Sequence, residues 1–293
     1  MTEGLVLKCV GGLYSVLCKK PDQNRTVECR ARGLFRKDNF APTAGDRVLV
    51  DEEGAAPVLA EVLPRKNLML RPFVANVDRM LAVASIKEPG FNVGLLDKML
   101  AIAAEKGIGS AVVITKVDLA SAQDYVKLYS DAGYPCVSLC GKRKDEAREL
   151  EKLLVPGINL LSGNSGVGKT TLLNSFAGMA RKTGEISKAL NRGKHTTREA
   201  ELFEISEGVF ICDTPGFSAV NLETLTPDIL PEELADCFPE FAGRKENCKF
   251  TDCRHLSEPG CAVRAAVESG EIARSRYESY KLLFAEVSAI KRY

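Results

Sequence analysis

A glycine-rich segment between a short apolar run and a helical pattern constrains this chain more than any other stretch. Residues 158–162 (INLLS) predict a buried strand, and Leu172, Leu173 and Phe176 recur at helical spacing after the loop. The loop itself, GNSGVGKT, matches G-x-x-x-x-G-K-[ST], a pattern whose backbone N–H groups wrap the phosphates of a nucleotide. A glycine-rich turn without a ligand is the alternative. Because strand, loop and helix occur together, the sequence predicts a nucleoside triphosphate site.

Each part of this loop has an expected role at the phosphates. The ammonium of Lys169 reaches the β- and γ-phosphates, and the hydroxyl of Thr170 is placed to bind Mg²⁺. Both groups lie at the reacting phosphate, so we count them among the candidate catalytic residues. The helix N-terminus adds partial positive charge. The candidate phosphate-binding residues are Gly163, Asn164, Ser165, Gly166, Val167, Gly168, Lys169, Thr170 and Thr171.

A second motif specifies the base. Residues 111–115 (AVVIT) predict another buried strand, and Thr115-Lys-Val-Asp118 stands at its end. The carboxylate of Asp118 can accept hydrogen bonds from N1–H and the 2-amino group of guanine, and adenine does not offer that pair of donors. The segment resembles the [NT]-K-x-D motif of GTPases; a polar turn at a strand end is the alternative. The candidate base-contacting residues are Thr115, Lys116, Val117, Asp118 and, at the end of the predicted strand 135–139, Ser138.

A third element ends the predicted strand 209–212 (VFIC). Asp213-Thr-Pro-Gly216 resembles the D-x-x-G element, in which the carboxylate binds Mg²⁺ through water and the glycine N–H reaches the γ-phosphate. In the basic segment before it, Thr196 or Thr197 is expected to complete the Mg²⁺ shell. The sequence does not decide between these two threonines.

The attacking water needs a residue to orient it. Ras-like enzymes usually carry glutamine where this chain has Phe217, and a phenyl ring cannot hydrogen-bond water. His195 is the histidine near the nucleotide motifs, and its imidazole can accept from that water. A solvated histidine on a basic loop is the alternative. We assign His195 as the candidate catalytic residue.

The order of the motifs indicates a circular permutation. The guanine motif precedes the phosphate loop, whereas ordinary small GTPases have the reverse order. Buried strands over 80–84, 111–115, 135–139, 200–205 and 209–212 alternate with helices over 95–104, 123–132 and 142–154. Such alternation predicts a parallel sheet with helices on both faces.

The first 65 residues lack helical periodicity. About five short β segments, interrupted by turn residues, predict a small OB-like barrel. OB barrels often bind nucleic acid, and a basic cluster in this region would suit that role; a solvated edge is the alternative. The cluster comprises Arg25, Arg30, Arg32, Arg36 and Lys37.

Four potential metal ligands lie within fourteen positions near the C-terminus. Three thiols and one imidazole suit a tetrahedral Zn²⁺, whereas disulfides would leave one cysteine unpaired and the histidine unexplained. We therefore expect one structural zinc per chain, held by Cys248, Cys253, His255 and Cys261. The tail 263–292 has helical periodicity, and its cations lie on or near the polar face: Arg274, Arg276, Lys281, Lys291 and Arg292. That face is either solvated or directed toward RNA.

Composition sets limits on location but names no partner. Lysines and arginines number 40 against 39 acidic residues, so the overall charge is balanced. The N-terminus lacks a signal layout, and no apolar run approaches the length of a membrane span. Without a signal peptide, the ten cysteines suit a reducing compartment. We expect a cytoplasmic monomer with no membrane partner.

Across nearly its whole length the chain resembles the ribosome-small-subunit-dependent GTPase A family (RsgA, also called YjeQ). The resemblance implies a bacterial GTPase that binds the small (30S) ribosomal subunit and its 16S rRNA late in maturation, with hydrolysis of GTP to GDP stimulated by the subunit. The segments that carry it are Ala44–Val48, Pro64–Asn67, Thr115–Asp118, Gly163–Thr171, Gly193–Thr197, Asp213–Phe217 and the four candidate zinc ligands.

The predicted protein thus has three parts. These are an OB-fold barrel over 1–65 that binds RNA, a circularly permuted α/β P-loop GTPase domain over 66–222, and a mainly α-helical zinc domain over 223–293. A GTP-dependent RNA-binding switch, in which nucleotide state controls affinity and turnover is incidental, is the alternative function. An ATP-dependent kinase or transporter subunit is disfavoured by Asp118.

Overall fold

The computed structural model describes residues 1–19, 24–32, 41–70, 72–140, 146–179, 200–213 and 229–290. The chain divides into two compact units. The first comprises Met1–Arg79, Leu154–Leu161 and Leu173–Phe217; the second comprises Met80–Leu153, Ser162–Leu172 and Ser218–Tyr293. Four predicted site residues lie outside the described residues: His195, Thr196, Thr197 and Gly216.

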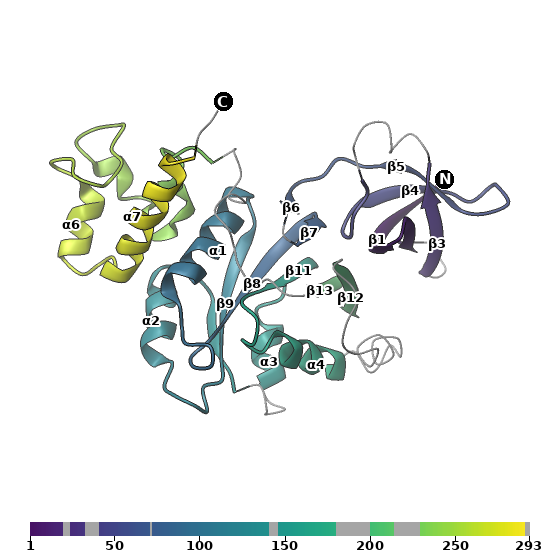
Figure 1. Cartoon of the computed structure of the whole chain (residues 1–293), viewed down its shortest axis with the longest axis horizontal. Helices are drawn as coiled ribbons and strands as arrows, with labels where there is room; N and C mark the ends of the chain where they lie inside the picture. Colours follow the sequence, from purple (N-terminus) through teal and green to yellow (C-terminus); the bar gives the residue numbers. More distant parts are fainter. Residues whose placement is uncertain are drawn as a thin grey trace. The chain divides into compact units, whose positions relative to one another are not determined.

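Five strands at the start of the first unit close into a barrel (Figure 1). They are β1 (Thr2–Val10), β2 (Leu13–Cys18), β3 (Arg25–Ala31), β4 (Arg47–Asp51) and β5 (Val58–Val62). Neighbours follow the order β1-β2-β3-β5-β4, and β4 pairs back with β1, so every barrel strand has two partners. Alternate residues, including Val6, Val16 and Val48, fill the interior. The predicted barrel is confirmed.

The rest of the first unit is a short sheet whose strands are not all parallel. β11 (Gly157–Ser162) and β13 (Val209–Asp213) are parallel, but β12 (Glu201–Ser206) runs antiparallel to β13 and to β1. The prediction of a wholly parallel sheet is therefore wrong for β12. Only two residues join β12 to β13, and so short a connection can only reverse the chain.

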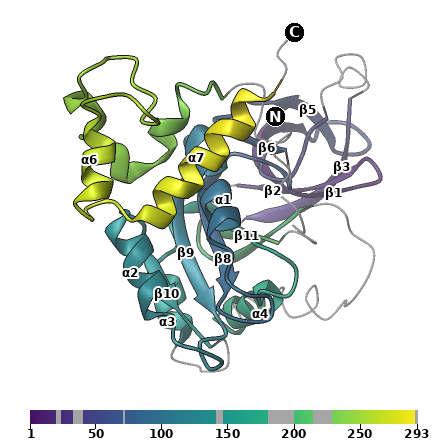
Figure 2. The same ribbon diagram turned by 60° about the vertical axis from the view of Figure 1, so that its left-hand side comes forward.

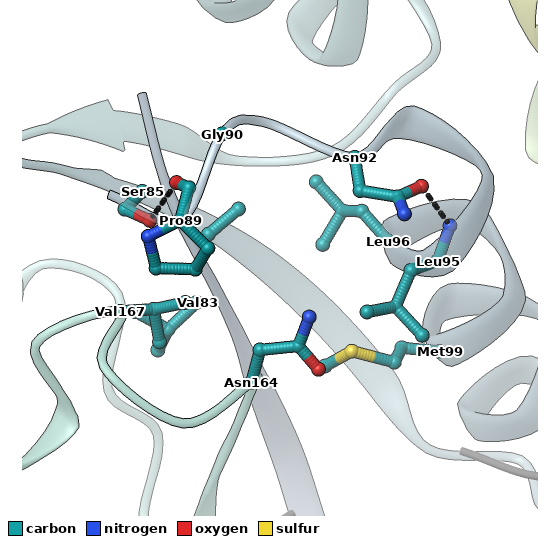
Figure 3. Close-up of a pocket in the computed structure, with 11 residues that line it drawn as sticks. Val83, Ser85, Pro89, Gly90, Asn92, Leu95, Leu96, Met99, Asn164 and Val167 are labelled. Atoms are coloured by element: carbon teal, nitrogen blue, oxygen red, sulfur yellow. Dashed lines mark hydrogen bonds between the residues drawn. The ribbon is translucent and has the colours of Figure 1, made fainter. Parts of the chain in front are cut away.

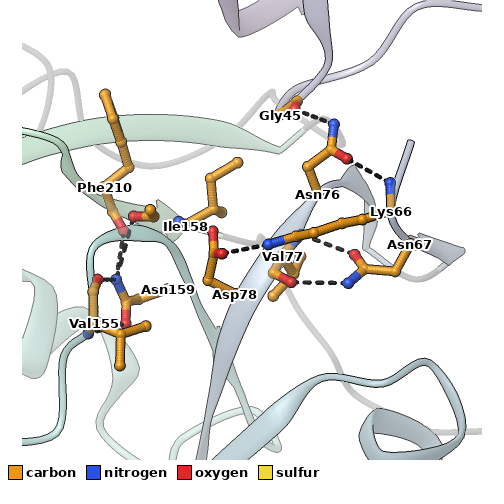
Figure 4. A network of polar contacts seen from close by, with 11 residues as sticks. Gly45, Lys66, Asn67, Asn76, Val77, Asp78, Val155, Ile158, Asn159 and Phe210 are labelled. Atoms are coloured by element: carbon orange, nitrogen blue, oxygen red, sulfur yellow. Dashed lines mark hydrogen bonds and ion pairs between the residues drawn. The ribbon is translucent and has the colours of Figure 1, made fainter. Parts of the chain in front are cut away.

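A hairpin that the sequence did not reveal, β6 (Leu68–Leu70) and β7 (Phe73–Ala75), follows the barrel. A polar network next to it joins the barrel to the strand before the phosphate loop (Figure 4). The Asn76 side chain donates to the Gly45 carbonyl (2.9 Å) and accepts from the Lys66 N–H (2.9 Å). Asp78 pairs with the Lys66 ammonium and accepts from the Ile158 N–H (2.7 Å). The segments Ala44–Val48 and Pro64–Asn67 thus contribute to one connection within this unit.

The second unit begins within β8 (Val77–Ser85), and the strands of this part follow the order β10-β9-β8. β9 (Gly109–Thr115) and β10 (Cys136–Ser138) are parallel. The helices of this part are α1 (Val93–Glu105), α2 (Gln123–Asp131) and α3 (Glu146–Glu151); α4 (Lys169–Met179) follows the phosphate loop. The strands, α1 and α2 agree with the predicted ones, because each has local apolar residues at the expected spacing. The helix expected over 142–154 ends earlier, at Glu151, and its first predicted residues, 142–145, lie outside the described part of the chain.

The C-terminal part of the second unit is mainly helical, as expected. Three 3₁₀ turns, η4 (Leu234–Cys237), η5 (Pro239–Phe241) and η6 (Lys245–Asn247), precede α6 (Ala262–Glu268) and α7 (Arg274–Ser288). The single helix expected over 263–292 is wrong, because Gly270 (φ +82°) turns the chain between α6 and α7. α7 packs along α1 (Figure 2). Within the described ranges, no helix combines the length and apolarity of a membrane span.

The placement of Arg276 on a polar face was also wrong. Its side chain is 1% exposed and lies between Asp97 of α1 and Glu240 of η5. Two nitrogens of the guanidinium donate to the two oxygens of Glu240 (2.7 and 3.1 Å), and a third donates to Asp97. A periodicity argument places charged side chains in solvent because it considers one helix alone. Arg276 can be buried because neighbouring elements supply two buried carboxylates that pair with it.

Candidate nucleotide site and metal centre

The phosphate-binding loop runs from Gly163 to Gly168, between β11 and α4. A methyl group on Gly163 would lie 2.2 Å from the carbonyl oxygen of Val83, so only glycine fits there. Gly168 adopts φ +100°, a conformation that other residues rarely adopt, immediately before the helix. The described backbone therefore has the strand, tight loop and helix that the sequence predicted.

The predicted phosphate-binding side chains lie at the end of this loop. The Lys169 ammonium donates to the carbonyls of Gly163 (2.6 Å) and Asn164 (2.7 Å), which holds it inside the curve of the loop. Thr170 and Thr171 are exposed at the start of α4. The loop thus presents a cation and hydroxyl groups at a helix N-terminus, an arrangement suited to an anion with a bound divalent cation.

Thr115 connects the guanine motif to the phosphate loop. Its hydroxyl, at the end of β9, donates to the carbonyl of Val167, and its side chain is buried. A methyl group on Gly168 would lie 3.7 Å from the same side chain. The structure therefore places the two motifs in direct contact, although 52 positions separate the bonded residues.

The other residues predicted to contact the base lie at the same end of the sheet as Thr115. Lys116 adopts a left-handed conformation (φ +59°), and its ammonium donates to the carbonyl of Glu88. Asp118 is exposed. Ser138 is exposed at the end of β10, in register with Ile114 of β9. Ser138 and the guanine motif thus lie at the same ends of neighbouring parallel strands.

Asp213 ends β13, as the D-x-x-G element requires.

One neighbour of the phosphate loop was not predicted from the sequence: the segment 86–91 between β8 and α1 (Figure 3). With the phosphate loop and α1 it encloses a small cavity lined by residues that include Ser85, Pro89, Asn92, Met99 and Asn164. The signal that would have found it is Pro89-Gly90, a turn at the carboxyl end of a buried strand.

The four predicted metal ligands form one cluster, with ligand atoms all within 4.8 Å of one another. Nδ1 of His255 lies 3.6 Å from Sγ of Cys248 and 3.4 Å from Sγ of Cys261, and these sulfurs are 4.0 Å apart. A disulfide requires about 2.05 Å between sulfurs. Bond lengths of about 2.3 Å to sulfur and 2.0–2.1 Å to nitrogen place tetrahedral ligand atoms about 3.5–3.8 Å apart. The cluster could therefore hold one metal ion.

The surroundings of the cluster fit a bound cation. The N–H groups of Ala262 and Arg264 donate to the sulfurs of Cys248 and Cys261 (both 3.4 Å), which stabilises thiolates. His255 is buried, and burial lowers its pKa, which favours the neutral imidazole that ligates metals. The hydroxyl of Tyr277 donates to the His255 carbonyl (2.7 Å) and fixes its left-handed backbone (φ +61°).

Comparisons with family models and with known proteins all match this chain to the same family. The model of the RsgA N-terminal domain matches residues 3–56, and that of the RsgA GTPase matches residues 62–223. Proteins called small ribosomal subunit biogenesis GTPase RsgA are similar over nearly their full length. That of Lactobacillus johnsonii is 43% identical (98% of this chain, 95% of that protein), and that of Shouchella clausii is 39% identical (100% and 99%).

Two crystal structures are also similar. YloQ, described as a circularly permuted GTPase, has a TM-score of 0.80 and 32% identity, covering 100% of this chain and 97% of its own. YjeQ from Thermotoga maritima has a TM-score of 0.80 and 34% identity, covering 99% of each chain. The likeness supports the permuted order of motifs read from the sequence.

Proposed function

This chain belongs to the RsgA family of GTPases, and from that premise we propose that it hydrolyses GTP in the late maturation of the small ribosomal subunit, which stimulates the reaction. The observation that supports this most directly is the contact between Thr115 and Val167, because it joins a guanine-selecting motif to a phosphate loop. Neither motif alone specifies a GTPase.

In the proposed site, Asp118 selects guanine and the stem of Lys116 lies against the base, with Val117 and Ser138 beside it. The loop 163–168 and Thr171 contact the phosphates, and Lys169 neutralises charge that develops during in-line attack by water. Thr170 and Asp213 would hold Mg²⁺, which supplies further positive charge at the phosphates. The exposed Thr170 hydroxyl at the start of α4 fits that role.

Three residues outside the described part of the chain complete the proposal. His195 orients the attacking water, since Phe217 cannot do so. Thr196 or Thr197 closes the Mg²⁺ shell, and the Gly216 N–H reaches the γ-phosphate. These assignments rest on the motifs.

At the C-terminal cluster we propose one structural Zn²⁺. Three thiols and one imidazole suit zinc, and four protein ligands leave no position for a substrate. This metal would hold the loops between η6 and α6, where the chain has little regular structure of its own.

We propose three domains: a barrel (1–65), a GTPase domain (66–222) and a zinc domain (223–293). We further propose that the protein is a cytoplasmic monomer and that it contacts 16S rRNA through the barrel and the zinc domain.

The barrel's basic cluster supports RNA binding only in part. Arg25 pairs with Glu52 and Arg32 with Asp51, so two of its cations are already neutralised.

The test is phosphate release from GTP and from ATP, with small subunits, with large subunits and without ribosomes. We expect hydrolysis of GTP alone, slow in isolation and faster by orders of magnitude with the small subunit. Activity that does not respond to the subunit would leave a GTPase without the proposed partner. Hydrolysis of ATP at a similar rate would overturn the role of Asp118.

Replacing His195 with alanine distinguishes this enzyme from a binding switch. If the protein acts as an enzyme, the variant loses turnover while its GTP affinity stays unchanged. If the protein acts as a switch, the variant keeps its nucleotide-dependent affinity for the subunit and loses little of its function.

A further inference from the structure

We infer that the segment 86–91 between β8 and α1 is a third wall of the guanine-nucleotide site and that Ser85 is a positioning residue for Lys116. The inference rests on the proposed function, because it concerns how the same site binds the base. The sequence motifs for nucleotide binding do not include this segment.

The first step concerns the lysine. The ammonium of Lys116 donates to the carbonyl of Glu88, in the middle of the segment. At the other end of the residue, the backbone is fixed because the Ile86 N–H donates to the carbonyl of the preceding Thr115 (3.1 Å). The segment therefore holds both ends of the lysine whose methylene stem is expected to lie against the base.

The second step concerns what fixes the segment itself. Ser85 is 2% exposed, and its hydroxyl donates to the carbonyl of Pro89 (2.7 Å; Figure 3). The Pro89 ring lies beside the phosphate loop, since a methyl group on Gly166 would lie 3.6 Å from its Cδ. The hydrogen bond from Ser85 thus restrains the peptide next to the Glu88 carbonyl.

The third step concerns the far end of the segment. The Phe91 ring stacks on that of Tyr125 in α2, with centroids 3.9 Å apart and planes at 21°. Asn92 then caps α1 by accepting from the Leu95 N–H (3.0 Å). The segment is anchored at both ends, and Lys116 is bound at its centre.

These contacts predict a specific effect of removing the Ser85 hydroxyl. The Pro89 carbonyl would lose its partner, the Glu88 carbonyl would no longer be held, and Lys116 would be less well positioned for the base. Because GTP and GDP share the base, affinity for both should fall equally. The hydrolysis rate of bound GTP should be unchanged, since none of these residues contacts the γ-phosphate in the proposed site.

The experiment measures dissociation constants for mant-GDP and mant-GTP, and single-turnover GTP hydrolysis, on full-length Ser85→Ala and wild type. We expect both dissociation constants to rise about 3- to 10-fold, the equivalent of one hydrogen bond. The rate constant for bound GTP should stay within about twofold. Ser110→Ala is the matched control, because among the described residues that buried hydroxyl has no hydrogen-bond partner.

A double-mutant cycle separates positioning from general loosening. In a Lys116→Met background, Ser85→Ala should change the dissociation constants no further. An undiminished effect in that background, or unchanged constants for Ser85→Ala alone, would overturn the inference. If Ser85→Ala does not fold, Pro89→Ala serves instead: it keeps the carbonyl that Ser85 binds but removes the ring beside Gly166, so it tests whether the segment positions Lys116 and should also raise both dissociation constants without changing the rate constant for bound GTP. A wild-type protein that binds neither nucleotide would refute the proposed function itself.

Discussion

The hydroxyl of Thr115 donates to the backbone carbonyl of Val167, and this single proton links the base-selecting strand end to the phosphate loop. The commoner asparagine of this motif has two N–H donors. Threonine has one, and the carbonyl of Ala84 lies within its reach as well (3.3 Å). One hydroxyl hydrogen bond therefore ties the guanine motif directly to the phosphate loop.

Thr115→Val removes this hydroxyl and preserves the shape of the side chain. We expect GTP and GDP affinity to fall about tenfold, because the buried Val167 carbonyl loses its partner and the loop is held less firmly. Titration with mant-GDP would measure the change. Thr115→Ser retains the hydroxyl and should bind within about threefold of wild type. If valine and serine variants bind equally well, the hydrogen bond is not what joins the motifs.

Removal of the proposed zinc should unfold the C-terminal part of the second unit. Cys261→Ala takes away a ligand that also caps α6, so we expect less than one zinc per chain and a thermal midpoint lower by 10 °C or more, of the order known for metal-stabilised domains. Elemental analysis and thermal unfolding would measure both. Cys237→Ala is the control: this cysteine is also buried but lies outside the cluster. A full zinc content in Cys261→Ala would contradict the assignment of ligands.

Local patterns explain which parts of this structure were predictable. The barrel strands, the phosphate loop and the four cluster residues each depend on side chains close together in sequence, so spacing was enough. Their partners across the chain were not predictable. That Thr115 bonds to Val167, and that Lys116 bonds to Glu88, depends on which strand ends meet, and the motif alone does not state this.

The errors have the same origin. Helical periodicity placed Arg276 in solvent because it considers one helix at a time, whereas the buried carboxylates of Asp97 and Glu240 come from other elements. The tail appeared to be one helix because apolar residues kept their spacing through Gly270. The antiparallel β12 was missed because strand composition does not encode strand direction.

Arg276→Met should be strongly destabilising. It would leave the carboxylates of Asp97 and Glu240 buried without their cation, and breaking such a pair costs about 3–5 kcal/mol. We expect urea unfolding to show a loss of that size. Arg274→Met, two residues earlier and exposed at the start of α7, is the control and should change stability by less than about 0.5 kcal/mol. Similar stability of both variants would mean that the buried pair is not needed to hold α7 on α1.

Gly157→Ala should destabilise the connection between the barrel and β11. Gly157 adopts φ +102°, and an added methyl group would lie 2.0 Å from the Asp78 carboxylate. That carboxylate accepts from the Ile158 N–H at the start of β11, so its displacement would also break this bond. We expect a loss of about 2–3 kcal/mol in urea unfolding, from backbone strain and the lost hydrogen bond together.

Gly208→Ala is the matched control for this variant. Gly208 also has a positive φ (+71°) and accepts from the Gly157 N–H (2.8 Å), but a methyl group there would meet nothing within 4 Å. It should therefore cost only the strain of the left-handed backbone, about 1 kcal/mol. Equal losses for the two variants would mean that strain alone accounts for Gly157. A larger loss at Gly157 would instead show that the Asp78 carboxylate must stay in place for β11 to pair as it does.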